Sequence, residues 1–450
     1  MIKAQKLLDR LERLLAVLYA GLVFAPITVG SVLLIEGLIV WLLAIVLAFF
    51  EKLRTGSRDA LDSRLGGALK APLAVPLLIF SYCVALSGFV NHGPYEAWKS
   101  FYSLKAMMVY FWMHQVLYRY NGESRGMSGN SAAANLLGLM LLAGAVSGTW
   151  GSLQQILNFH PFSRFPYLQA TGFIGHPMAF AGQMEIASMV ALGFLITRTF
   201  RSLPAPLDRP PVYFLVTALN FAGLLFASER SAWLGVMVAS LVLSFLVSRR
   251  MFVKVVFLLF TLVVAAWFTV PVVRARIEPL LADYRQDVST TVRLRVWKTS
   301  LDVFRRHPLV GVGIRHYPAQ NIPEAVVPGV SDRLVHAHSN YLHILATLGI
   351  TGFVGYIYLI VSSVRACYRR WRRGLSLGEP FDTGLGLGCL GAVATLMVAG
   401  LFEFNFGTGA VRMAYWFVLA LIVAIPGSKM EPGPAATSEA PGGEQTHDHH

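Results

Sequence analysis

Three histidines lie within eight residues of one another, where a long polar stretch gives way to a long apolar one. They are His336, His338 and His343, in the run His-Ala-His-Ser-Asn-Tyr-Leu-His. The ordinary pKa of a histidine is about 6.5, so a neutral ring can accept a proton from a sugar hydroxyl near neutral pH. We therefore predict a general base here and assign that role to His338. The structural alternative is a histidine that only bonds backbone carbonyls at a loop-to-helix junction.

The residues that follow the base are polar at helical spacing. If Ser339 or Asn340 caps the next helix, then Asn340, His343 and Thr347 share one face and predict a polar stripe directed into a helix bundle. Tyr341 suits either a supporting role or an anchor at a membrane interface. The predicted supporting residues are His336, Asn340 and Tyr341.

The segment from Arg293 to Arg306 has the pattern of an amphipathic helix. Its aliphatic and aromatic residues fall on one arc of a helical wheel, and most of its charged residues, including Arg295, fall on the opposite arc. Arg293 lies in the middle of the apolar arc, where a guanidinium is costly unless it meets an anion. We predict that Arg293 binds phosphate with Arg295 in support; the alternative is a side chain that snorkels to the interface. Pro308 predicts the end of this helix.

A second isolated arginine occurs in the run Ser-Glu-Arg-Ser from Ser228 to Ser231, which interrupts an otherwise apolar stretch. So short an interruption predicts a tight hairpin between two membrane spans, with Arg230 at the outer surface, where positive residues are disfavoured. Arg230 is predicted to be a fixed cation for phosphate, because its fork is always charged and can bind bidentately. A local ion pair with Glu229 is the structural alternative.

Several common motifs are absent from the sequence. It contains no Asp-x-Asp for a metal-bound nucleotide sugar, no Gly-x-x-x-x-Gly-Lys-Ser/Thr loop for ATP and no His-Glu-x-x-His for zinc. The three cysteines, Cys83, Cys367 and Cys389, have no metal-binding spacing. We therefore expect neither a cofactor nor a metal. A substrate already activated on a lipid diphosphate would need only a base and cations for the leaving group.

The elements that position these groups must be membrane helices. Hydrophobic residues make up 55% of the 450 residues and charged residues 14%, and the mean hydropathy is +0.57, which together exclude a soluble domain of this length. A bilayer core of about 30 Å requires about 20 apolar residues per helix. The fold class predicted is an all-α polytopic membrane protein with about twelve spans. The spans are expected near 14–30, 32–50, 71–90, 98–118, 132–153, 173–197, 211–228, 231–248, 252–271, 340–364, 384–404 and 409–426.

The placement of charge tests this topology. With both termini in the cytoplasm, 23 of the 38 lysines and arginines fall on the cytoplasmic segments. The net charge of +14 is then mostly a matter of topology, and the dispersed basic residues predict no nucleic-acid partner.

One long external loop separates the ninth and tenth spans. It carries ten lysines or arginines, six acidic residues and four histidines, and a loop of this length is usually functional. The predicted organisation is nine spans over 1–271, a periplasmic loop with amphipathic helices over 272–338, three spans over 339–426 and a disordered cytoplasmic tail over 427–450.

Several segments together resemble the O-antigen ligase and polymerase superfamily. They are the Ser-Glu-Arg-Ser hairpin, the Arg293-Leu294-x-x-Trp297 helix that runs into His-Pro-Leu-Val-Gly-Val-Gly, the His-x-His-Ser-Asn-Tyr-Leu segment, and Leu-Gly-Ile-x-Gly at 348–352. The stretch Gly-Phe-Ile-Gly-His-Pro at 172–177 adds weaker support. The resemblance covers the whole topology, and it implies a metal-independent glycosyltransferase of GT-C type in a Gram-negative inner membrane.

The resemblance also implies the reaction: transfer of undecaprenyl-diphosphate-linked O-antigen to a lipid A-core sugar at the periplasmic face, with inversion. His338 is then the expected base, and Arg230 and Arg293 hold the diphosphate. Relatives that polymerise O-antigen or glycosylate proteins are alternatives within the superfamily; one dominant loop and a short tail favour the ligase. A lipid-linked sugar transporter or flippase is the alternative outside it. The outer residues Lys99, Lys105 and Arg412 suit either the diphosphate or acidic core phosphates.

Overall fold

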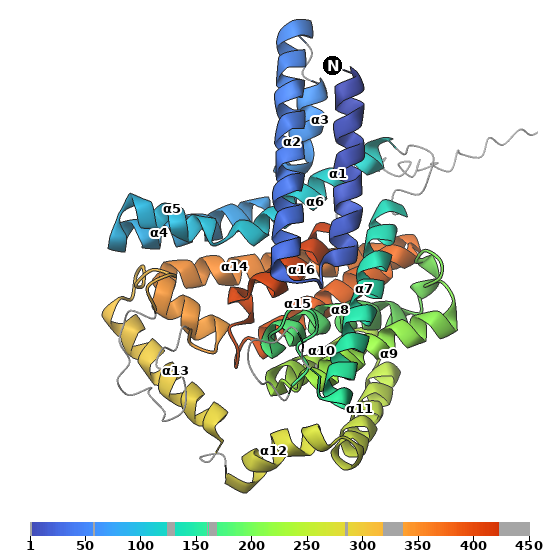
Figure 1. Ribbon diagram of the computed structural model, residues 1–450, viewed down its shortest axis with the longest axis vertical. Coiled ribbons are helices and arrows are strands. Elements are labelled where there is room, and N and C mark those ends of the chain that lie inside the picture. Colours follow the sequence, from blue (N-terminus) through green and yellow to red (C-terminus); the bar gives the residue numbers. More distant parts are fainter. Residues whose placement is uncertain are drawn as a thin grey trace, which may run out of the picture.

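The computed structural model describes residues 2–56, 59–123, 131–159, 161, 169–283, 287–317 and 336–422. Within these ranges the regular structure is entirely helical (Figure 1), which confirms the predicted all-α class. The helices are α1 (Ile2–Leu22), α2 (Ile27–Thr55), α3 (Asp59–Leu69), α4 (Ala74–His92), α5 (Pro94–Tyr102), η1 (Lys105–Met107), α6 (Met108–Glu123), α7 (Ser131–Leu157), α8 (Pro177–Thr197), η2 (Phe200–Ser202), α9 (Pro210–Ala227), α10 (Arg230–Val247), α11 (Arg249–Thr269), α12 (Pro271–Asp283), α13 (Val288–Arg306), α14 (Asn340–Leu377), α15 (Pro380–Ala399), η5 (Asn405–Gly407) and α16 (Gly409–Ala420).

Nine of the described helices are long and apolar enough to cross a membrane: α2, α4, α7, α8, α9, α10, α11, α14 and α15. Each coincides with an expected span, so the polytopic class is confirmed. The other three expected spans differ. The span at 14–30 is divided by the turn that ends in Pro26, and the span at 98–118 is divided between α5 and α6 by a short 3₁₀ turn. At 409–426 the helix α16 has only 12 residues, and the described chain ends at Ile422.

Two helices form the centre of the bundle. Of the most apolar 18-residue segment of each helix, 89% is buried in α8 and 83% in α15. In α11 only 6% of this segment is buried, and its apolar surface faces outward. Gly193 and Gly388 lie where α8 meets α15, and a Cβ on Gly193 would come within 2.3 Å of the Gly388 backbone. Small residues at such crossings let membrane helices pack closely. Helices α1 and α2 form a hairpin that projects from this bundle (Figure 1).

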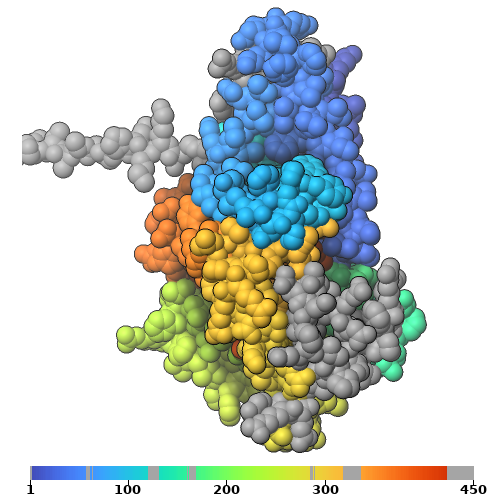
Figure 2. All heavy atoms as spheres, turned by 90° about the vertical axis from the view of Figure 1, so that its left-hand side faces the viewer, coloured from blue at the N-terminus to red at the C-terminus, as the bar shows by residue number. Residues whose placement is uncertain are grey.

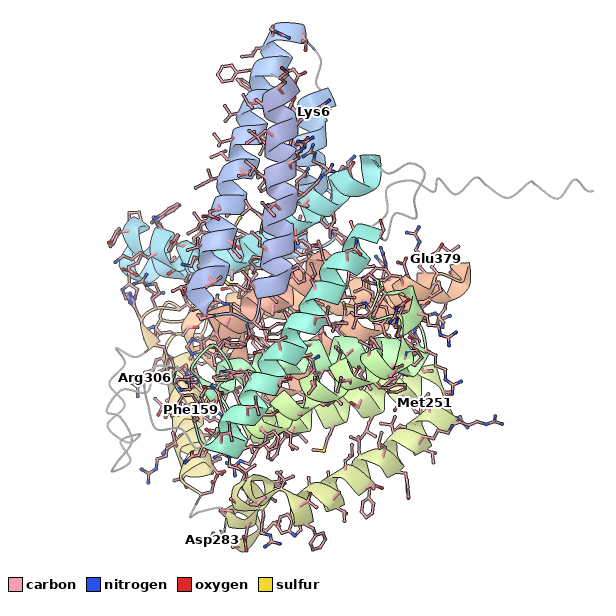
Figure 3. All side chains as sticks on the ribbon, turned by 45° about the vertical axis from the view of Figure 1, so that its right-hand side comes forward. Lys6, Phe159, Met251, Asp283, Arg306 and Glu379 are labelled. Atoms are coloured by element: carbon pink, nitrogen blue, oxygen red, sulfur yellow. The ribbon has the colours of Figure 1, made fainter. Side chains whose placement is uncertain are left out.

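The predicted orientation of the spans stays a prediction. In Figure 3, Glu379 and Met251, which adjoin expected cytoplasmic segments, lie on the right, and Phe159 and Arg306 lie on the left, whereas Lys6 of the expected cytoplasmic N-terminal segment lies at the top. Residues 318–335 of the expected external loop and the tail predicted for 427–450 lie outside the described residues.

The loop is built as helix α13 followed by a sharp return against α14. Helix α13 ends at Arg306, before Pro308, as predicted. Gly311 has φ +63°, and a Cβ there would collide with the backbone of Thr347, which explains the need for glycine. The N–H of Gly313 donates to the carbonyl of Thr347 at 2.8 Å. Figure 2 shows α13 in yellow beside the light-blue pair α4 and α5.

Candidate functional site

His338 lies in the loop that leads into α14. Of the two caps predicted for this helix, Ser339 and Asn340, the structure has Ser339, whose side chain accepts a hydrogen bond from the Leu342 N–H. His338 itself has φ +46°, a left-handed conformation that is uncommon for residues other than glycine and clusters at functional sites. Its carbonyl accepts a hydrogen bond from the Trp297 indole at 3.4 Å, so α13 helps to hold the loop in place.

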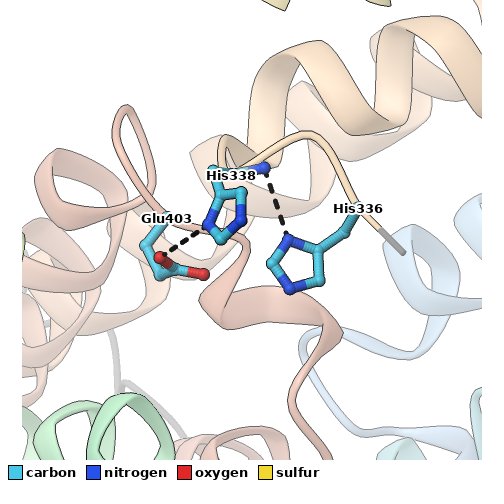
Figure 4. Close-up of side chains that lie close together, drawn as sticks. All are labelled: His336, His338 and Glu403. Atoms are coloured by element: carbon cyan, nitrogen blue, oxygen red, sulfur yellow. Dashed lines mark hydrogen bonds and ion pairs between the residues drawn. The ribbon is translucent and has the colours of Figure 1, made fainter. Parts of the chain in front are cut away.

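The partner of the His338 ring is Glu403, in the loop after α15. Nδ1 of His338 lies 3.3 Å from Oε2 of Glu403 (Figure 4). Burial raises the pKa of Glu403, but the hydrogen bond from His338 and the charge of Arg293 outweigh burial and hold this pKa at about 2. The carboxylate is therefore ionised at neutral pH. It favours the ring tautomer with its proton on Nδ1, which leaves Nε2 as an acceptor.

His336 packs edge-on against the base, with ring centroids 4.3 Å apart. Its Nδ1 accepts a hydrogen bond from the backbone N–H of His338 at 3.4 Å (Figure 4). Burial lowers the pKa of His336 to about 4, so this ring is neutral at neutral pH. His336 therefore shapes the site around His338 without adding charge to it.

The same three side chains are the candidate metal ligands. Donor atoms of His336, His338 and Glu403 lie within 4.8 Å of one another, and two histidines with one carboxylate can bind zinc. However, Oε2 of Glu403 also lies 3.6 Å from the guanidinium of Arg293. A divalent ion would bring two further positive charges close to that fixed cation, so the arrangement suits an ion-paired base better than a metal centre.

The polar stripe predicted on α14 is present, and its members Asn340, His343 and Thr347 are buried. The Asn340 side chain donates to Oδ1 of Asn405 at 2.7 Å and accepts from the Phe406 N–H at 3.0 Å. These bonds fix the segment that follows Glu403. Asn340 thus contributes through the position of the loop.

Tyr341 also holds the α14–α15 contact. Its hydroxyl donates to the carbonyl of Met397 at 3.0 Å. This bond ties the first turn of α14 to the last turn of α15, just before the loop that carries Glu403.

Arg293 points into the protein from α13, as the helical wheel predicted. Its Nε donates to the carbonyl of Phe402 at 2.8 Å, and it also bonds Ser289 and pairs with Glu403. The guanidinium therefore meets an anion, and the snorkelling alternative is wrong. Arg295, predicted as a supporting cation, is exposed on the opposite face of α13, away from this group.

Arg230 begins α10 at the predicted hairpin. Its guanidinium pairs with Asp287 at 2.8 Å and donates to the carbonyl of Arg276 at 3.2 Å. The local pair with Glu229 is therefore wrong. Arg276 of α12 approaches Glu229 instead, at 3.9 Å. Burial raises the pKa of Glu229 to about 7, against the opposing effect of Arg276, so this carboxyl is partly protonated near neutral pH.

The three arginines share one pocket of about 410 Å³. Apolar side chains make up most of the rest of its wall. The lining residues are Glu229, Arg230, Ser231, Leu234, Arg276, Leu280, Thr290, Arg293, Leu294, Trp297 and Phe402. Phe402 and Arg293 join this arginine pocket to the His338–Glu403 pair. Cations beside an apolar wall suit a ligand with an anionic head and a hydrocarbon chain.

A second pocket of about 340 Å³ is lined by His336, which packs against His338, and by Phe404, which follows Glu403, together with Arg315 and Arg412. Arg412 donates to the carbonyl of Ser103 at 3.0 Å. Of the other outer cations, Lys99 pairs with Glu96 at 3.6 Å and Lys105 lies over the ring of Tyr102. Neither lysine lines the arginine pocket.

Sequence reasoning missed Glu403, Arg276 and Asp287. A signal existed for Glu403, since it is an isolated acidic residue at the outer end of the apolar stretch 384–404. Arg276 and Asp287 stand among other charges in the loop, and nothing in their spacing marks them. Asp287 also caps α13, accepting from the Thr290 N–H at 2.9 Å, which links helix formation to the Arg230 pair.

The comparison with curated proteins found no match. A family model described as O-Antigen ligase matches residues 215–357, the segment that carries Arg230, Arg293 and His338. Glu403 lies outside the matched segment. The match, together with the membrane helices, supports membership of this chain in the O-antigen ligase superfamily.

Proposed function

We propose that this protein is an O-antigen ligase that transfers polysaccharide from undecaprenyl diphosphate to a hydroxyl of a lipid A-core sugar, at the periplasmic face of the inner membrane. The family supports ligase- or polymerase-type chemistry in general. One observation carries the finer proposal: a pocket with three arginines adjoins a histidine–carboxylate pair, and Arg293 belongs to both.

In the proposed reaction, Nε2 of His338 takes the proton of the acceptor hydroxyl as its oxygen attacks the anomeric carbon. The bond from that carbon to the phosphate oxygen breaks, and the leaving diphosphate keeps the electron pair. Attack on the face opposite the diphosphate inverts the anomeric centre. Glu403 stabilises the imidazolium that forms, since its carboxylate lies beside Nδ1.

The arginine pocket is proposed to hold the diphosphate. Charge builds up on the phosphate oxygens as the glycosidic bond breaks, so cations that bind the leaving group more tightly than the ground state lower the barrier. When the diphosphate binds, Arg230 gives up part of its pairing with Asp287 and binds phosphate oxygens instead. Arg293 does the same with its pairing to Glu403. Leu234, together with the other apolar lining residues, accommodates the first isoprene units.

The second pocket is proposed to admit the acceptor. It opens beside His336 and Phe404, and His336 packs against the ring of His338. Inversion requires that the acceptor hydroxyl reach the sugar on the face opposite the leaving group. Arg315 and Arg412 supply positive charge for the phosphates of the lipid A-core.

The deciding experiment is transfer from a lipid-linked O-antigen donor to purified lipid A-core by the reconstituted protein, with EDTA and without nucleotide. Wild type should form product and release undecaprenyl diphosphate. His338→Ala should lose transfer, whereas His307→Ala, at an exposed histidine just after α13, should retain it. Folding of each variant is checked by thermal unfolding.

Each other outcome assigns a different function. Growth of the donor chain without lipid A-core would identify a polymerase, and transfer to protein alone would identify a protein O-oligosaccharyltransferase. Movement of intact donor across the membrane without its cleavage would identify a flippase. Full activity of His338→Ala would remove His338 from the mechanism, and loss of wild-type activity with EDTA would make the His336–His338–Glu403 cluster a metal site.

A further inference from the structure

A third pocket lies far from the base, between the start of α4 and the C-terminal half of α14. Its volume is about 460 Å³. Pro72, Val75 and Pro76 form an apolar wall, and arginines of α14 form the facing wall. Helix α14 is kinked at Gly349, whose φ is +64°. Arg369 lies about 30 Å along the helix from this kink, given the helical rise of about 1.5 Å per residue. The pocket is therefore separate from the proposed transfer site.

Four arginines line it, Arg365, Arg369, Arg370 and Arg373, and all but Arg370 are spaced four residues apart on one face of α14. Within the described part of the chain, none of the three forms an ion pair, whereas the neighbouring Arg370 pairs with Asp382 at 2.6 Å. Like charges at this spacing repel one another. Three guanidinium groups that converge on a pocket without a carboxylate favour an anionic ligand.

The same face of α14 becomes apolar toward the middle of the helix. Val354, Tyr358 and Val361 precede Arg365 at spacings of four, three and four residues, and all three are exposed. Val75 of α4, also exposed, faces the same pocket. From Val354 to Arg365 the helix rises about 16 Å, close to half of a hydrocarbon core of about 30 Å. The surface thus matches the length of one lipid leaflet.

From this geometry we propose that the arginine-lined pocket between α4 and α14 binds the headgroup phosphate of an anionic phospholipid, whose acyl chains lie along the exposed apolar stripe of α14. The segment 365–373 is one of the basic segments expected at the cytoplasmic surface, where anionic lipid is attracted to clustered arginines. A free phosphate would bind the arginines but would leave the exposed apolar stripe of α14 without a ligand. A lipid covers both the arginines and the stripe, so the two features together favour a lipid.

The test is binding of phosphatidylglycerol to the purified full-length protein, measured by native mass spectrometry with phosphatidylcholine as the reference lipid. The double variant Arg365→Gln/Arg369→Gln should bind phosphatidylglycerol about 30-fold more weakly, from about fivefold per arginine. Arg372→Gln is the matched control, because Arg372 is exposed on the same helix but does not line the pocket, and it should bind as wild type. Thermal unfolding in detergent shows that each variant is folded.

Several results would overturn the proposal. Equal binding by wild type and the double variant would show that the pocket is not the site, and an equal loss in Arg372→Gln would show only a general attraction between basic residues and anionic lipid. Competition by inorganic phosphate as effective as by phosphatidylglycerol would exclude the acyl contact. Lipid binding that requires removal of residues 428–450 would make the acidic tail the occupant in the intact protein.

Discussion

Replacing Glu403 with glutamine removes the charge beside His338 while keeping a group that can hydrogen-bond to the ring. In wild type the carboxylate lies 3.3 Å from Nδ1 and stabilises the imidazolium that forms when Nε2 takes the acceptor proton. Glutamine leaves that imidazolium without a counter-charge. We therefore expect Glu403→Gln to slow the chemical step.

The expected magnitude follows from the pKa of Glu403. Its fall from the ordinary value of 4.5 to about 2 corresponds to about 3 kcal/mol of stabilisation of the carboxylate by its surroundings. If most of this stabilisation acts between the carboxylate and the imidazolium in the transition state, its loss in Glu403→Gln lowers kcat about 100-fold. The KM for the donor should not rise, because Arg293 loses only its carboxylate partner.

Steady-state transfer by the reconstituted protein separates these effects, with the acceptor saturating and the donor varied. Glu379→Gln is the matched control, since it makes the same change at an exposed site beyond the other end of α15. The reasoning is refuted if Glu403→Gln keeps wild-type kcat, or if its whole defect is in the KM for the donor. Because Glu403 is ionised above about pH 2, it should contribute no titration to the wild-type rate near neutral pH.

Three further predictions concern the surrounding residues. Arg293→Lys keeps the charge but loses the fork, so kcat/KM for the donor should fall about tenfold, the equivalent of one charge-assisted hydrogen bond. Most of the loss should be in kcat, because the leaving group is bound most tightly in the transition state; an unchanged kcat would contradict this. The pKa of Glu229 is about 7, so below that pH the carboxyl is neutral and the arginine pocket carries more net positive charge. Donor affinity should therefore fall as the pH rises through about 7. Glu229→Gln should remove this pH dependence, and a variant profile parallel to that of wild type would contradict the prediction. Asn340→Ala removes two hydrogen bonds to the segment after α15 and should lower the free energy of unfolding by about 2 kcal/mol. Its Tm should be lower than that of the exposed-site control Asn135→Ala. Equal Tm values for the two variants would show that these bonds contribute nothing to stability.

The sequence alone predicted the features that depend on neighbours along the chain. Hydropathy and charge predicted the polytopic class and the long external loop. The spacing of apolar residues predicted the helix at 293–306, and the types of its residues predicted that Arg293 would point inward. Ser339 as a cap and the hairpin before Arg230 also followed from local rules, because capping and turn formation depend on a few consecutive residues.

Only the tertiary structure decided the partners of these residues. His338 and Glu403 are 65 positions apart, and Arg293 meets the carbonyl of Phe402 across 109 positions. No periodicity spans such separations, since the contacts arise from how α13, α14 and α15 pack. For the same reason the sequence could offer only the adjacent Glu229 as the structural alternative for Arg230, whereas packing supplied Asp287. Local pattern thus identified which side chains were unusual, and long-range packing decided which charges they meet.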